Sequence, residues 1–115
     1  MKSSEFQNYK NRYRAAIRRV LAEAERGRFD ETGFPAYSHQ NPLINWLFWQ
    51  RLHTAINHIE KNAPYENALD FGCGSGVMLP FLAQHSRQVT AIDIDLVPLE
   101  RVTKHIPLAK NIRVI

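Results

Sequence analysis

The chain has 115 residues, with 15 lysines and arginines against 11 aspartates and glutamates and a formal net charge of +4. Its hydrophobic share of 44% excludes a disordered tail, and its single cysteine excludes a disulfide-dense module, a zinc ribbon and an iron–sulfur site. The length permits one domain, no apolar run approaches the roughly 20 residues of a membrane span, and the first residues do not form a signal peptide, so we expect a cytoplasmic protein.

The first predicted element is a helix over residues 8–26, where apolar side chains recur at three- and four-residue steps and Gly27 is a plausible stop. The whole positive excess lies in residues 1–65, and much of it decorates this helix. A solvated helix face is the favoured interpretation. A patch for nucleic acid or another anionic partner is the alternative, disfavoured because no aromatic side chains alternate on that face.

A loop rich in glycine, proline and serine follows, and then Asn41-Pro42 predicts the start of a second helix over residues 42–61. Apolar residues cover more than half of this helix, so it should be buried on more than one side. Trp46 and Trp49 are therefore predicted as core residues rather than as the lining of a substrate pocket. The histidines do not stand at ligand spacing, so no metal site is expected.

The sequence pattern most informative about the fold begins at Glu66. A short strand, ENALDF, runs into the glycines of GCGSG, and an apolar helix, VMLPFLAQHS, should start close to Gly76 or Val77 because Pro80 is tolerated only in a first turn. A strand QVTAIDI, a short helix over 96–106 and a strand NIRVI complete the pattern. Alternating strands and helices predict an α/β fold with parallel strands and right-handed crossovers.

The chemistry of this loop points to a ligand that contains a nucleoside. Glycines let a ligand approach the main chain closely, and an acidic strand end beside the loop can accept hydrogen bonds from ribose hydroxyls. Asp93 lies 21 residues after Gly72, which matches the roughly 20-residue spacing of that arrangement. The dinucleotide fingerprint G-x-G-x-x-G is absent, because Val77 or Leu79 stands where the third glycine belongs, and no Walker loop occurs.

The pattern D-x-G-x-G-x-G, from Asp70 to Gly76, resembles the first motif of the class I S-adenosylmethionine-dependent methyltransferases over roughly residues 68–95. The resemblance implies that Gly72, Gly74 and Gly76 wrap the methionine portion of S-adenosylmethionine. It implies that Asp70 orients the loop and the amino group of the cofactor.

The resemblance further implies that Asp93 holds the ribose hydroxyls and that Ile94 lies against the adenine. Cys73 is then a small residue of the cofactor loop, and Asp95 a helix cap rather than a further polar contact. An oxidoreductase fragment that binds a nicotinamide dinucleotide, and a non-catalytic module that binds through the basic helix, are the alternatives.

The implied fold is a helical extension over residues 1–63, followed over 64–115 by the first half of a Rossmann-like sheet in the order 3-2-1. The family has seven strands, so we expect a truncated methyltransferase whose exposed sheet edge a second copy of the chain could cover. The methyl acceptor is expected to be a small molecule, with nucleic acid unlikely. Residues 34–39 could close over the cofactor, and Tyr37 and His39 are the candidates for a catalytic base.

Overall fold

The computed structural model describes residues 1–23 and 41–115. Every helix and strand expected in these ranges is present, with shifted ends. The elements are α1 (Ser3–Glu23), α2 (Pro42–Asn62), β1 (Tyr65–Phe71), α3 (Leu79–His85), β2 (Ser86–Ile92), α4 (Val97–Thr103) and β3 (Ile112–Val114). The proposed lid over residues 34–39, with Tyr37 and His39, lies outside the described residues.

The three strands form one parallel sheet in the order β1-β2-β3, which is the predicted order. Ala68 of β1 is paired with Val89 of β2, and Val89 is paired with Ile112 of β3, so these three residues lie side by side across the sheet. Parallel neighbours require crossover connections, and α3 and α4 supply them. The predicted partial Rossmann-like fold is therefore confirmed.

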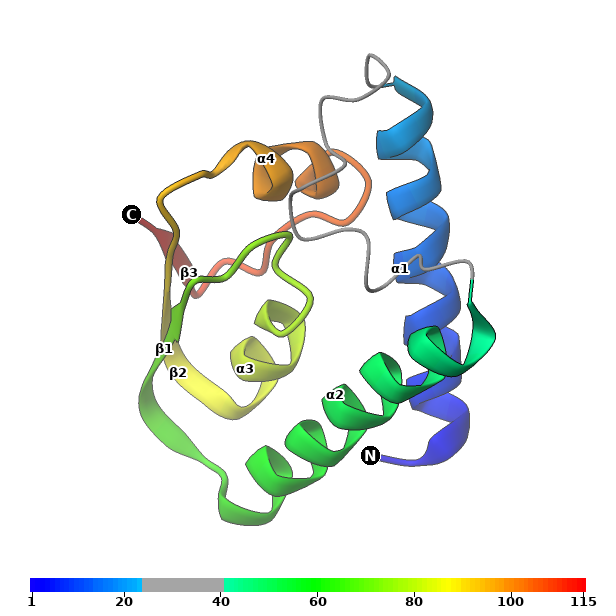
Figure 1. Cartoon of the computed structure of the whole chain (residues 1–115). Coiled ribbons are helices and arrows are strands. Elements are labelled where there is room, and N and C mark those ends of the chain that lie inside the picture. Colours follow the sequence, from blue (N-terminus) through cyan, green and yellow to red (C-terminus); the bar gives the residue numbers. More distant parts are fainter. Residues whose placement is uncertain (24–40) are drawn as a thin grey trace.

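The helices all lie on the same side of the sheet (Figure 1). α3 and α4 form the layer next to the strands, and α1 and α2 form a second layer outside them. The side chains of each strand accordingly alternate between the buried face and the exposed face of the sheet. Val89 and Ala91 of β2 point toward the helices and are fully buried, whereas Leu69 and Phe71 of β1 are 58% and 81% exposed on the opposite face.

The two N-terminal helices share a core with the rest of the chain. Tyr13 and Ile17 of α1 and Trp49 of α2 belong to one buried cluster together with Phe81 of α3 and Val102 of α4. α1 begins five residues earlier than predicted, because Phe6 also packs into this cluster and its burial favours one more turn. Its side chains Arg12, Arg18 and Arg19 are exposed, as a solvated face requires.

α2 begins where the sequence predicts. The side chain of Asn41 accepts hydrogen bonds from the amides of Leu43 and Ile44 at 2.9 and 3.5 Å, and proline occupies the first helical position. The prediction for the tryptophans is half right. Trp49 is 1% exposed, whereas Trp46 is 50% exposed, because the described residues cover only one side of this apolar helix. In the described ranges no helix is long and apolar enough to cross a membrane.

The predicted start of the third helix was wrong. α3 begins at Leu79 rather than at Gly76 or Val77, and the segment in front of it is a turn. The amide of Gly76 donates to the carbonyl oxygen of Cys73 at 2.8 Å, and the amide of Leu79 donates to that of Gly76 at 3.1 Å. These bonds close a turn before the helix starts, and Pro80 still lies in the first turn.

Candidate functional site

The glycine loop is attached to the carboxyl end of β2. The amides of Gly72 and Cys73 both donate to the carbonyl oxygen of Ile92, at 2.8 and 3.0 Å. Gly72 has φ +76° and Gly74 has φ +54°, conformations that side chains with a Cβ rarely adopt. The chain therefore reverses sharply at the edge where β1 and β2 both end, which is the edge where open α/β sheets bind ligands.

The glycines of the loop face two different environments. A Cβ built on Gly72 or on Gly74 would meet no atom within 4 Å. A Cβ built on Gly76 would lie 2.6 Å from Cδ1 of Leu99 and 3.1 Å from Cδ1 of Leu79. Gly72 and Gly74 thus leave open space beside the main chain, whereas Gly76 is required by the close packing of the loop on α3 and α4.

Asp93 connects the end of β2 to the loop. One carboxylate oxygen accepts a hydrogen bond from the amide of Gly74 at 2.7 Å, and the other accepts from the amide of Asp95 at 3.0 Å. The hydrogen bond from Asp95 and then that from Gly74 lower the pKa of Asp93 below its ordinary value, so it is ionised at neutral pH. Each oxygen retains a second lone pair, and these can accept hydrogen bonds from a ligand.

Asp70 lies at the end of β1, next to the loop. Burial raises the pKa of its carboxyl, and the negative charge of Asp93 raises it further. In the described part of the chain, neither carboxylate forms an ion pair with a lysine, arginine or histidine. Among the described residues the site therefore has negative charge and no counter-ion, and a positively charged ligand group would be favoured there.

The side chain of one predicted cofactor-site residue, Cys73, is buried away from the open space. Cys73 is 7% exposed in a cluster with Leu79, Val89 and Leu99, and burial followed by the charges of Asp70 and Asp93 raises the pKa of its thiol. Its side chain is a packing group and faces away from the open side of the loop.

Ile94 has a fully exposed side chain and directly follows Asp93 at the end of β2. Asp95 accepts a hydrogen bond from the amide of Val97 at 3.0 Å. It therefore stabilises the start of α4, although it stands one residue before the formal cap, Leu96, rather than at the cap itself.

Sequence reasoning missed the support that α1 gives to this loop. The hydroxyl of Tyr13 is hydrogen-bonded to the hydroxyl of Ser75. Both residues are buried, with exposed fractions of 1% and 3%. The hydroxyl of Tyr9 donates to the carbonyl oxygen of Val77 at 2.7 Å. In the sequence both tyrosines belong to the apolar face of the helix predicted over residues 8–26, and that periodicity does not indicate hydrogen bonds from their hydroxyls. Their four-residue spacing, with a hydroxyl on each, was the signal available, because a buried hydroxyl needs a partner.

Comparison with known proteins agrees with this geometry. Residues 69–115, less than half of the chain, match the family model described as a methyltransferase domain. No curated protein sequence matches the chain.

The solved structures that are similar to this chain include two proteins. One is the N-methyltransferase NodS from Bradyrhizobium japonicum in complex with S-adenosyl-L-homocysteine, with 22% identity over 91% of this chain and 46% of that one, and a TM-score of 0.48. The other is precorrin 8w decarboxylase from Methanobacterium thermoautotrophicum, with 25% identity over 56% of this chain and 37% of that one, and a TM-score of 0.46.

The chain spans less than half the length of either solved protein. Residues 69–115 match a methyltransferase domain, and the three strands have the order that the resemblance implied.

Proposed function

We propose that the loop and the two aspartates bind S-adenosylmethionine, and that the chain is the cofactor-binding part of a methyltransferase. One observation carries the proposal. An open glycine turn lies beside Asp70 and Asp93, two carboxylates that no described cation neutralises. S-adenosylmethionine carries an ammonium and a sulfonium, and both positive charges would be favoured there.

The residues present fit this group. Gly72 and Gly74 leave room for the methionine portion against the main chain, and Asp70 favours its ammonium. Asp93, already fixed by two backbone amides, would accept the ribose hydroxyls through its remaining lone pairs. Ile94 offers an exposed apolar surface to the adenine.

When bound, S-adenosylmethionine supplies an activated methyl group on a sulfonium, which is already a good leaving group. The chain's own residues then have to orient the donor and exclude water from it. The acceptor is proposed to be a small molecule. Tyr37 and His39 remain the candidates for a base, and an oligomer that covers the outer edge of β1 remains a prediction.

Asp70 disfavours the alternative of a nicotinamide dinucleotide, whereas Asp93 could accept ribose hydroxyls from either cofactor. A pyrophosphate on the glycine loop would bring negative charge next to the carboxylate of Asp70, and like charges repel. The two cofactors therefore make opposite demands on the charge of the site, which a binding experiment can separate.

The test is calorimetric titration of the chain with S-adenosylhomocysteine and, separately, with NADH. We expect saturable binding of S-adenosylhomocysteine alone, and a loss of about tenfold or more in Asp93→Asn, since hydrogen bonds to a charged group are worth about 1.5–3 kcal/mol. Glu100→Gln removes an exposed carboxylate of α4 and is the matched control. Binding of NADH by the folded chain, or equal affinity in Asp93→Asn and wild type, would refute the proposal.

A further inference from the structure

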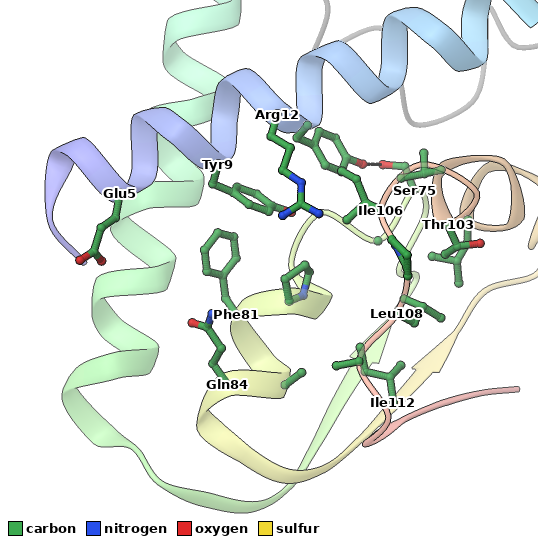
Figure 2. A pocket seen from close by; sticks show the side chains of 18 of the residues that line it. Glu5, Tyr9, Arg12, Ser75, Phe81, Gln84, Thr103, Ile106, Leu108 and Ile112 are labelled. Atoms are coloured by element: carbon green, nitrogen blue, oxygen red, sulfur yellow. Dashed lines mark hydrogen bonds between the residues drawn. The ribbon is translucent and has the colours of Figure 1, made fainter.

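A cavity of about 570 Å³ lies on the reverse side of the glycine loop (Figure 2). α1, α3, α4 and the segment before β3 enclose it partly, and Ser75 and Gly76 form its boundary with the loop. Gly72, Gly74 and Asp93, the groups of the proposed cofactor site, do not line it. The cavity is therefore a separate space, divided from the cofactor side by the loop itself.

The walls of this cavity are mainly apolar. They include Pro80, Phe81, Val102, Ile106, Leu108 and Ile112. Small-molecule sites are typically concave spaces of roughly 300–1,000 Å³ with apolar walls and a few polar groups that fix orientation. In volume and in lining the cavity has the properties of such a site.

A cation of α1 points into the cavity. The guanidinium of Arg12 extends from α1 into the space between Tyr9 and Ile106 (Figure 2). Within residues 1–23 and 41–115, no carboxylate lies within ion-pair distance of Arg12. The nearest acidic lining residue along the helix, Glu5, is seven positions away, about 10 Å along the axis, and its side chain is directed away from Arg12.

The hydroxyls that line the cavity near Arg12 already have hydrogen-bond partners. Tyr9 donates to Val77, Tyr13 is bonded to Ser75, and the hydroxyl of Thr103 donates to the carbonyl oxygen of Glu100 at 3.0 Å. The guanidinium is thus the group best placed to recognise a ligand, and its planar fork matches a carboxylate.

We propose that this cavity binds a small organic acid with an apolar body. The carboxylate pairs with Arg12 at the α1 side, and the apolar body lies against Phe81, Val102 and Ile106. A neutral apolar molecule would leave the guanidinium unpaired, and a nucleotide would bring more polar groups than the walls can satisfy. This site does not depend on the proposed cofactor function, because its ligand is held by other residues.

The test uses decanoate as the probe and decanol as the uncharged molecule with the same tail, each titrated into the 115-residue chain by calorimetry. We expect one saturable site for decanoate, with decanol bound about fivefold more weakly because the ion pair with a partly exposed arginine is modest. Arg12→Gln should reduce the affinity for decanoate to that for decanol and leave decanol unchanged. Arg19→Gln, an exposed arginine of α1 that does not line the cavity, should change neither.

A second variant tests the location. Ala83→Trp fills the cavity from α3 and should abolish binding of both probes, while leaving binding of S-adenosylhomocysteine intact. Circular dichroism verifies that the variant is folded, and Arg12→Gln, a surface change, provides the test if it is not. Absence of saturable decanoate binding, equal effects of Arg12→Gln and Arg19→Gln, or unchanged binding in folded Ala83→Trp would overturn the proposal.

Discussion

Gly76 and Gly74 both have positive φ, yet their replacement by alanine should have different consequences. Gly76→Ala places a Cβ in the left-handed region, at a cost of about 1–2 kcal/mol. It also places that Cβ 2.6 Å from Leu99 and 3.1 Å from Leu79, which are 2% and 0% exposed. Overpacking of a buried site costs about 1–3 kcal/mol, so we expect a total loss of about 2–5 kcal/mol in the free energy of unfolding.

Gly74→Ala is the matched comparison. It has the same backbone cost of about 1–2 kcal/mol but no steric one, because a Cβ there meets no atom within 4 Å. That Cβ would, however, occupy the open space proposed for the cofactor. Gly74→Ala should therefore lower the affinity for S-adenosylhomocysteine about tenfold or more, whereas the folded fraction of Gly76→Ala should bind it nearly as wild type does.

Urea denaturation followed by circular dichroism measures the stability of the two variants, and calorimetry measures their affinity. We expect Gly76→Ala to lose more stability and less affinity than Gly74→Ala. Equal losses of stability would refute the contact between Gly76 and Leu99. A stability difference without an affinity difference would leave that contact intact and refute the assignment of Gly74 to the cofactor site.

Two further predictions concern the groups that fix the loop. In a double-mutant cycle of Tyr13→Phe and Ser75→Ala, each single change should destabilise the chain by about 1–3 kcal/mol, since each leaves a buried hydroxyl with one partner fewer, and the double variant by less than their sum. Strict additivity in urea denaturation would show that the two hydroxyls are not coupled. The pKa of Asp93 is lower in the folded chain than its ordinary 3.8, so the stability that its ionised form contributes is fully present above pH 3.8 and is lost as pH falls through the folded-state pKa. The difference in unfolding free energy between wild type and Asp93→Asn should accordingly shrink as pH falls below 3.8, and a constant difference would contradict the two hydrogen bonds to this carboxylate.

The order of the elements and the position of the glycine loop could be predicted because they depend on local chemistry. The cap at Asn41 requires only a side-chain oxygen two residues before an amide, and Asn-Pro supplies it. Alternation of apolar side chains marked β2, and the spacing of Gly72 and Asp93 placed an acidic strand end beside the loop. The predicted start of α3 was wrong because backbone hydrogen bonds close the turn before it, and no side-chain pattern in the sequence indicates such bonds.

The sequence by itself determined the fold class and the residues that gather at the ends of β1 and β2, because periodicity and turn chemistry are local rules. The order of the strands came from the resemblance to the methyltransferases, and the structure confirms it. Only the tertiary structure decided which loop residues face outward and which face the core. In the folded chain Gly72 and Gly74 face open space, whereas Gly76 is packed against Leu99 and Leu79. Cys73 is buried, and Tyr13 of α1 contacts Ser75, which lies 62 residues further along the chain. The physical reason is that a side chain's environment depends on the elements packed against it, and α1 reaches the loop only once the whole chain has folded.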